Sequence, residues 1–327
     1  MTADEPRIAW GTERLWHDLR PLLPGLSIEV IERTDSTNSE LLARARVRPD
    51  PQPEAEGALV HRSAEHGAFG RRAQDTQPCL LVAEQQTGGR GRQGRSWLSE
   101  RGASLTFSLG LPLAPGDWSG LSLVVGLAVA EALDPAPGDR TPRLMLKWPN
   151  DLWILGAAPG ATAEEPPAIG RKLGGVLIET VGTGAEGGAR RQVVIGVGLN
   201  IAPLGPPEGH ADWLAHFGCV RELDPQASPV TTLGRVAEPL VRAVLEFERH
   251  GFGAFAERYR RRDLLVGRHV RTTAREAPEG VAEGVSAQGA LRLSTGLGVV
   301  ELSVGEVSVR PDGAPPSGPT PLDDGRA

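Results

Sequence analysis

The sequence predicts an α+β protein of two domains, a large one that mixes strands with helices and a small all-β one after it. Its 327 residues are more than one domain usually needs and can bury a sizeable core. Up to about residue 264, apolar runs of strand length are interspersed with longer runs of helical period. From Leu265 the pattern changes to short alternating runs joined by Gly-rich turns, which predicts a β domain of about 45 to 50 residues.

The first half of the large domain is expected to contain a helix, a strand, a second helix and two further strands. The ranges are 12–23, 28–32, a helix that begins near Thr37, 79–84 and 104–111. Thr37 is followed three residues later by Glu40, which is the capping box that begins many helices. Residues 47–78 are rich in Pro, Gly and charge and lack any period, so we expect a mobile insertion there.

The second half begins with an apolar core helix at 118–133. RLMLKWPNDLWIL then predicts two strands with Pro149 at the break, and further strands follow at 172–181 and 192–201. Two loose hairpin tips (156–168 and 182–190) and two helices (231–250 and 253–263) complete the large domain, which we place at 1–264. The small domain occupies 265–310, and the composition of 311–327 predicts a disordered tail.

Charge and cysteine content exclude several classes of protein. A net charge of -6 argues against a general polyanion binder, because such affinity sums many phosphate contacts. Cys79 and Cys219 are too far apart for a metal motif and too few for a disulfide framework. No segment has the features of a signal peptide or the length of a membrane helix. We therefore expect a cytoplasmic protein that neither enters nor crosses a membrane.

Lysine and asparagine are unusually scarce. The chain has 33 arginines but only two lysines, Lys147 and Lys172, and only three asparagines, Asn38, Asn150 and Asn200. A position that keeps lysine in such a chain is a candidate for chemistry that needs a compact ammonium, which a planar guanidinium cannot imitate.

GGRGRQGRSW, residues 88–97, concentrates four glycines and three arginines. Its spacing matches a dinucleotide-binding fingerprint, but that motif needs a following helix, and here the chain continues towards a strand. A loop that closes over a nucleotide fits better, because glycines allow close backbone approach and arginines bind phosphate or carboxylate. Trp97 could stack on a flat ring such as adenine. A solvated basic loop is the alternative for this stretch taken alone.

Three further segments favour a site. LKWPNDLW places Lys147, Asn150 and Asp151 around a proline turn, GRKLGGVLIE places Lys172 before two glycines, and VVIGVGLNI ends in Asn200. Glycine within a strand often marks close backbone approach. The arrangement suits joining a carboxylate to ATP. These two anions repel by roughly 1 kcal/mol at about 4 Å in water and by about 4 kcal/mol near a protein surface, so fixed cations are needed.

These motifs, in this order and after DSTN (residues 35–38), closely resemble those of the biotin-protein ligases, also called biotin-[acetyl-CoA-carboxylase] ligases. The resemblance covers about residues 28–201, and the small β domain matches the family's C-terminal domain. It implies a catalytic core like that of class II aminoacyl-tRNA synthetases and an SH3-like C-terminal barrel. The implied reaction makes biotinyl-5'-adenylate from biotin and Mg-ATP, then transfers biotin to one lysine of a biotin carboxyl carrier domain.

The resemblance also assigns roles to single residues. The biotin-binding set is Ser36, Thr37, Asn38, Gln86, Arg90, Gly91, Arg92, Lys172, Gly174, Gly196 and Gly198. The ATP and adenylate set is Arg90, Arg92, Arg95, Trp97, Lys147, Asn150 and Asn200. The catalytic set is Lys147, Lys172, Arg92 and Asp151. Asp151 would orient or deprotonate the incoming lysine amine, and Lys147 would neutralise phosphate charge.

Several expectations concern partners and alternatives. Magnesium is expected with ATP, and the sequence does not identify the residues that would coordinate it. No tightly bound cofactor is expected. About 27 residues precede the first strand, too few for the helix-turn-helix domain of some relatives, so we expect a monofunctional ligase without DNA binding. Monomer and homodimer both remain open. A lipoate ligase and an RNA-binding protein are the rival functions. Ser36 to Asn38 could simply cap a helix, and Trp153 is expected to be a core residue.

Overall fold

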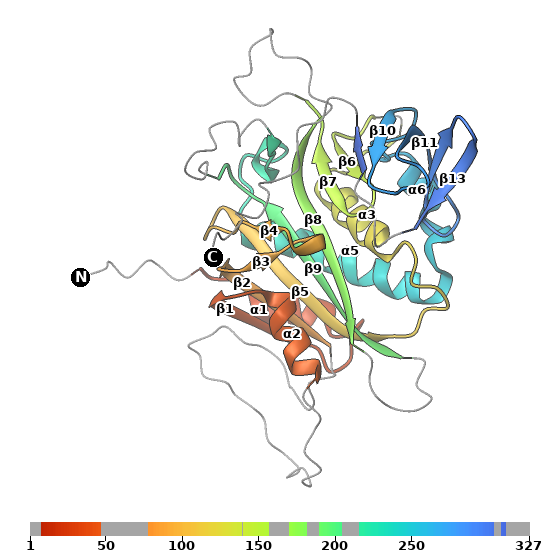
Figure 1. The fold of residues 1–327 in the computed structure, drawn as a ribbon. Coiled ribbons are helices and arrows are strands. Elements are labelled where there is room, and N and C mark those ends of the chain that lie inside the picture. Colours follow the sequence, from red (N-terminus) through yellow and green to blue (C-terminus); the bar gives the residue numbers. More distant parts are fainter. Residues whose placement is uncertain are drawn as a thin grey trace, which may run out of the picture.

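The computed structural model describes residues 8–46, 78–138, 140–156, 170–181, 190–204, 216–303 and 309–311. A seven-stranded sheet in the order β1-β2-β5-β9-β8-β7-β6 forms its centre (Figure 1). β1 and β2 pair in parallel and all other neighbours pair antiparallel, so the sheet is mixed. The strands are β1 (Ser27–Thr34), β2 (Cys79–Gln86), β5 (Ser104–Leu113), β6 (Leu144–Lys147), β7 (Asp151–Ile154), β8 (Arg171–Val181) and β9 (Arg191–Asn200).

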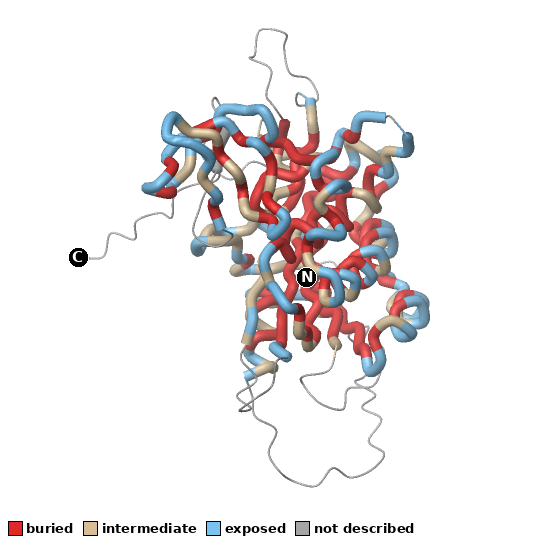
Figure 2. The backbone as a smooth tube through the Cα atoms, turned by 90° about the vertical axis from the view of Figure 1, so that its right-hand side faces the viewer, coloured by how far each residue is buried: buried red, intermediate tan, exposed pale blue. Residues whose placement is uncertain are grey.

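Helices cover both faces of this sheet. α1 (Thr12–Leu19), α3 (Leu121–Leu133) and α5 (Pro229–His250) lie on one face, and α2 (Thr37–Arg46) lies on the other (Figure 1). α3 is apolar on nearly every side because it is enclosed between the sheet and α5. Buried backbone runs mainly along the sheet and the inner sides of the helices (Figure 2).

The two faces of the sheet differ in chemistry because strand residues alternate. On β5 and β9, Leu105, Phe107, Ile195 and Val197 belong to the large core under α3 and α5. Their neighbours on the other face are small or polar. They are Ser104, Thr106, Ser108, Gly196, Gly198 and Asn200, and register places them in facing pairs. A sheet face this poor in large apolar side chains leaves room for other groups.

The small domain is a five-stranded antiparallel sheet in the order β13-β12-β11-β10-β14. Its strands are β10 (His269–Thr272), β11 (Glu279–Val285), β12 (Leu291–Thr295), β13 (Gly298–Leu302) and β14 (Val309–Pro311). The sequence did not reveal β11, because Gly280 and Gly284 interrupt its alternation. Gly284 has φ of 104° and lies where the pairing of β11 with β12 shifts register.

Contacts join the two domains directly. The indole N–H of Trp148 donates to the carbonyl of Gly289 at 3.0 Å. A Cβ on Gly289 would lie 2.9 Å from the Cα of Gly120, so the two backbones touch. The segment that leads into the small domain also contacts β6. The N–H of Leu146 donates to the carbonyl of Arg262, and the N–H of Leu264 donates to the carbonyl of Leu146.

Several helix boundaries differ from those expected. α1 ends at Leu19 because Pro21 has no N–H to continue the helical ladder. The helix expected at 253–263 is a 3-10 segment, Phe252–Phe255, followed by the short α6 (Ala256–Arg260). Of the expected insertion, only Pro78 lies among the described residues. Residues 157–169, 182–189 and 312–327, which hold most of both hairpin tips and nearly all of the tail, lie outside them.

Candidate functional site

The polar face of the sheet is covered by α2 and by a small hairpin formed from residues 89–97. The hairpin consists of β3 (Gly89–Arg90), a 3-10 turn (Arg92–Gly94) and β4 (Ser96–Trp97). It thus has defined pairing, Gly89 with Trp97 and Arg90 with Ser96, where the sequence suggested only a pliable loop. The elements directly after Gly94 are the strands β4 and β5 rather than an α-helix, which removes the basis for a dinucleotide-binding motif here.

The start of α2 forms a buried polar cluster with β2 and β5. Gln86 accepts hydrogen bonds from the backbone N–H of Thr37 at 2.8 Å and from its hydroxyl at 3.1 Å. The hydroxyl of Ser108 lies 2.6 Å from both Thr37 Oγ1 and Asn38 Oδ1. Ser36, Thr37 and Asn38 are each only 3% exposed. A flat polar ligand in this place would meet paired donors and acceptors.

The expected capping box at Thr37 is wrong. α2 begins at Thr37, and the residue before it, Ser36, accepts the N–H of Ser39 at 3.4 Å. The Thr37 hydroxyl is engaged by Gln86 and Ser108 instead, so tertiary contacts override the local capping pattern.

A chain of contacts links this cluster to the hairpin. The amide of Asn38 donates to the carbonyl of Leu177 at 3.2 Å and to Glu179 Oε2 at 2.9 Å. Glu179 also forms an ion pair with Arg90 of the hairpin at 3.0 Å. Both hydrogens of the Asn38 amide are therefore bonded within the protein, which indicates that Asn38 holds neighbouring groups in place.

Ser108 and Glu179 belong to the site but were not among the residues singled out from the sequence. Ser108 lies within SLTFSLGL and is fully buried. Glu179 lies near the end of the apolar run GGVLIE. A polar residue inside an otherwise apolar strand is the signal that could have identified both of them.

The hairpin brings two buried donors that have no partner among the described residues, Arg92 Nη2 and Trp97 Nε1. Arg92 Nη1 lies 3.5 Å from Asn150 Oδ1, while Asn150 donates to the carbonyl of Val176 at 2.8 Å. Burial lowers the pKa of Arg92, which Arg95 reinforces and Asp151 opposes. A half-buried guanidinium with one buried, unused N–H favours a bound anion.

The strand glycines accommodate protein side chains. A Cβ on Gly196 would lie 2.2 Å from Asn38 Oδ1, and one on Gly198 would lie 2.6 Å from Trp97 Cε2. Gly91 fits the hairpin, where its N–H donates to the carbonyl of Arg95 at 2.6 Å. The prediction that Gly174 leaves room for biotin is wrong, because its Cβ position faces Leu199 on the helix-covered side.

Both lysines of the chain converge on the edge of this face. Lys172 Nζ lies 2.8 Å from Asp151 Oδ1, and Gly175 lies beside both groups. Lys147 is 5% exposed, and its Nζ lies 4.9 Å from the centre of the Trp153 ring. Burial by itself would raise the pKa of Asp151, but the charges of Lys172 and Lys147 lower it below its ordinary value. Asp151 is therefore ionised at neutral pH.

Asn200 completes the row on β9. It is 4% exposed, and its amide donates to the carbonyl of Gly218 at 3.2 Å. The N–H of Gly218 in turn donates to the carbonyl of Lys172 at 2.9 Å, so the backbone of Gly218 links both residues. All three asparagines and both lysines thus lie around this polar face.

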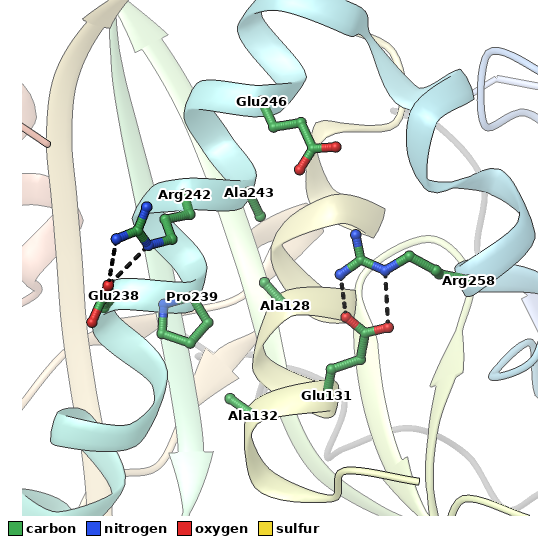
Figure 3. Close-up of a pocket in the computed structure, with 9 residues that line it drawn as sticks. All are labelled: Ala128, Glu131, Ala132, Glu238, Pro239, Arg242, Ala243, Glu246 and Arg258. Atoms are coloured by element: carbon green, nitrogen blue, oxygen red, sulfur yellow. Dashed lines mark hydrogen bonds and ion pairs between the residues drawn. The ribbon is translucent and has the colours of Figure 1, made fainter. Parts of the chain in front are cut away.

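Other features of the described chain lie apart from the site. A groove of about 510 Å³ runs between α3 and α5 on the helical face (Figure 3). Both arginines of its rim form ion pairs there, Arg258 with Glu131 and Arg242 with Glu238, and none of the predicted site residues lines it. Within the described ranges, no cluster of three His, Cys, Asp or Glu could hold a metal. No helix in them has the length and apolarity needed to cross a membrane.

Two family models match the sequence. One describes the biotin/lipoate A/B protein ligase family and covers residues 69–200, and the other describes the biotin protein ligase C-terminal domain and covers 266–310. Together with the mixed sheet and its cationic polar face, these matches define the class of biotin and lipoate protein ligases.

Individual relatives narrow the class. The biotin--[acetyl-CoA-carboxylase] ligase of Mycobacterium tuberculosis is 31% identical over 86% of this chain and 88% of its own. The bifunctional ligase/repressor BirA of Escherichia coli is 32% identical over 88% of this chain and 75% of its own. The chain belongs to the biotin protein ligase family. Its fold is also that of the Aquifex aeolicus biotin protein ligase in complex with biotin and ATP, with a TM-score of 0.60, 24% identity, and coverage of 87% and 98% of the two chains.

Proposed function

We propose that this chain activates biotin with ATP to biotinyl-5'-adenylate and then transfers biotin to a lysine of a biotin carboxyl carrier domain. The observation that carries the proposal is the convergence of four cations, Lys147, Lys172, Arg92 and Arg95, around the carboxylate of Asp151. A site that must hold a carboxylate against a triphosphate needs such a gathering of cations.

Biotin would lie on the polar cluster at the start of α2. Thr37 and Gln86 would contact the ureido group, with Ser36 beside them, and Asn38 and Ser108 would hold this cluster in place. Arg90 would keep the hairpin over the ligand through Glu179, an ion pair whose Arg90 side chain is 41% exposed and which is therefore weak enough to open. The biotin carboxylate would point towards Lys172. The backbone of Gly196 and Gly198 would border the biotin, while Asn38 fills the space over Gly196 and Trp97 fills the space over Gly198.

ATP would occupy the end of the face near the hairpin. Trp97, Asn150 and Asn200 would line the adenine and ribose, and the two donors Arg92 Nη2 and Trp97 Nε1 would find partners on the nucleotide. Arg92, Arg95 and Lys147 would neutralise the phosphates as the biotin carboxylate displaces pyrophosphate. Gly91 would allow the backbone of the hairpin to approach the reacting atoms.

Asp151 would orient or deprotonate the acceptor lysine in the second step. Before that step it holds Lys172 at 2.8 Å, so the same carboxylate would position the cation that binds the biotin carboxyl oxygen. Magnesium would enter with ATP, because the described residues offer no acidic cage and Mg²⁺ commonly binds through substrate phosphates.

The proposal also covers the domain boundaries, the acceptor protein and the cellular location. We place the catalytic domain at 1–264, with a core related to class II aminoacyl-tRNA synthetases, and an SH3-like barrel at 265–310. The five-stranded sheet and the family match over 266–310 support this division. The acceptor would be a carboxyl carrier subunit of acetyl-CoA carboxylase or an equivalent domain. The two free cysteines support a cytoplasmic location.

The test is incubation of the protein with ATP, magnesium, a carrier domain and either biotin or lipoate. We expect biotin-dependent pyrophosphate release and a carrier whose mass increases by one biotin. Labelling of the carrier with lipoate but not with biotin would overturn the proposal and favour a lipoate ligase. Retention on RNA that weakens with salt, without pyrophosphate release, would instead favour an RNA-binding protein.

A further inference from the structure

Lys172 lies near the start of β8, before the point that β9 reaches. β9 pairs with β8 from Gly174 onward, so the main chain of Lys172 needs another partner on the side away from β7. The segment 217–222, which follows β9 in the sequence, supplies one. Phe217 forms an isolated parallel bridge with Lys172, and the N–H of Gly218 donates to the Lys172 carbonyl at 2.9 Å. The segment therefore continues the sheet beside Lys172.

The same segment holds Asn200. The Asn200 amide donates to the carbonyl of Gly218 at 3.2 Å. A Cβ on Gly218 would lie 2.2 Å from Ile154 Cγ2 on β7, so the close approach of this backbone requires glycine. Gly218 thus contacts Asn200 through its C=O and Lys172 through its N–H. A displacement of the segment would shift both residues.

A buried ion pair anchors the segment to β8. The side chains of Arg171 and Glu222 are 3% and 13% exposed. Arg171 Nη1 donates to Glu222 Oε1 at 2.9 Å, and Nη2 donates to Oε2. Oε1 also accepts the N–H of Cys219 at 3.0 Å, and Nη1 also donates to the carbonyl of Phe217 at 3.3 Å. The pair therefore binds the backbone on both sides of Gly218.

The distinctive property of such a pair is its geometry. Burying two opposite charges loses much of their hydration, and a buried ion pair can often be replaced by apolar side chains without loss of stability. A guanidinium that meets a carboxylate with two parallel N–H bonds, however, fixes both the distance and the direction between two parts of a chain. Here the two parts are the start of β8 and the segment 217–222.

We propose that Arg171 and Glu222 are positioning residues for adenylate formation, which fix Gly218 so that its backbone holds Asn200 and Lys172 in place. The inference rests on the proposed function, because it concerns the residues assigned to ATP and to the biotin carboxylate. Neither side chain of the pair is proposed to touch a substrate. The sequence did not single out Arg171, which is one of 33 arginines.

The main test replaces the pair by apolar side chains, Arg171→Met together with Glu222→Leu. This double variant should fold with a stability in urea close to that of the wild type. Its KM for ATP, measured by biotin-dependent pyrophosphate release, should nevertheless rise by about 3- to 10-fold, the loss that one misplaced hydrogen bond accounts for. A folded double variant with the wild-type KM for ATP would overturn the inference.

Arg171→Lys is the second variant, because it keeps the charge and removes the two-pronged contact. It should raise the KM for ATP in the same range, and it carries the comparison if the double variant does not fold. A purely structural role would lower kcat in proportion to the unfolded fraction and leave this KM unchanged, since unfolded protein only reduces the amount of enzyme. That result would contradict the inference.

A double-mutant cycle shows whether the pair acts through Asn200. In an Asn200→Ala background, Arg171→Lys should raise the KM for ATP by less than about 2-fold further, because the amide that it positions is already gone. Full multiplicative effects would overturn the inference.

Arg262→Lys is the matched control. Arg262 is 4% exposed, compared with 2% for Arg171, and its guanidinium lies 3.6 Å from Asp134 and donates to the carbonyl of Leu144. The control should lower stability and leave the KM for ATP unchanged. A wild-type protein without biotin-dependent pyrophosphate release would overturn the proposed function, and this inference with it. An active wild type whose KM for ATP responds equally to Arg171→Lys and Arg262→Lys would overturn the inference alone.

Discussion

Replacing Gly198 with alanine is expected to weaken ATP binding and to leave both the fold and biotin binding nearly intact. The new Cβ would lie 2.6, 2.8 and 2.9 Å from Trp97 Cε2, Cζ2 and Nε1, where ordinary contact begins at 3.4 Å. The ring must therefore retreat by at least about 0.8 Å. Trp97 can do this because it belongs to a two-residue strand of the hairpin, whereas the backbone pairing of Gly198 need not change.

The size of the effect follows from the stacking that is lost. An aromatic platform under a base is worth about 1–3 kcal/mol, so complete loss corresponds to an increase of about 5- to 150-fold in the KM for ATP. Steady-state pyrophosphate release at saturating biotin measures this KM, and a biotin titration at saturating ATP gives the comparison. We expect the KM for biotin to stay within about 2-fold, since Trp97 lies at the nucleotide end.

Gly110→Ala is the matched control. Gly110 lies on β5 on the same face of the sheet, and its Cβ would meet Leu41 Cδ1 at 3.2 Å but no hairpin residue. The Gly110→Ala variant should be somewhat less stable than the wild type and should have an unchanged KM for ATP. The reasoning fails if Gly198→Ala folds normally and binds ATP like the wild type, or if the two KM values rise together.

Three further predictions concern single side chains. Lys172→Ala should abolish adenylate formation and preserve the fold; near-normal pyrophosphate release would refute its role. Arg92→Ala should either increase release of free adenylate or weaken biotin binding, which chromatography of the products and a binding titration would detect; unchanged behaviour in both would count against a covering role for the hairpin. Burial raises the pKa of Asp263 to about 6, above its value in the unfolded chain, so its ionisation destabilises the fold as the pH rises from about 4 to 7. Asp263→Asn keeps an acceptor for the N–H of Leu265. In urea unfolding, this variant should therefore have a free energy of unfolding about 1–2 kcal/mol higher than the wild type at pH 7 and nearly the same at pH 4. An equal change at both pH values would contradict this.

Most of the site could be predicted because its chemistry requires rare residue types at fixed places. Lys147, Lys172 and the three asparagines stood out against a background of arginine, and the structure places all five around one face of the sheet. The strands that carry them were also predictable, since their apolar runs are long and proline marks the turn at 149.

The remaining features depend on which face a residue occupies, and the sequence does not specify this. Gly174 and Gly175 are indistinguishable in the sequence, but of the two only Gly175 faces Asp151 and Lys172. Trp153 is buried, as expected of a core residue, but only the register with Lys172 assigns it to the polar face. The local signal at Thr37 failed for a similar reason, because Gln86 and Ser108 engage its hydroxyl from distant parts of the chain.

The bond between Trp148 and Gly289 bears on how the protein can be divided. Trp148 is 1% exposed and immediately precedes the proline turn that carries Asn150 and Asp151, yet its indole donates to a carbonyl 141 positions away. Without that carbonyl, a buried donor next to the proposed site loses its partner, at a cost of about 1–3 kcal/mol. Removing the small domain would therefore disturb the proposed site even though no residue of the site is deleted, and the unit to be transplanted, truncated or evolved in the laboratory is the whole two-domain body.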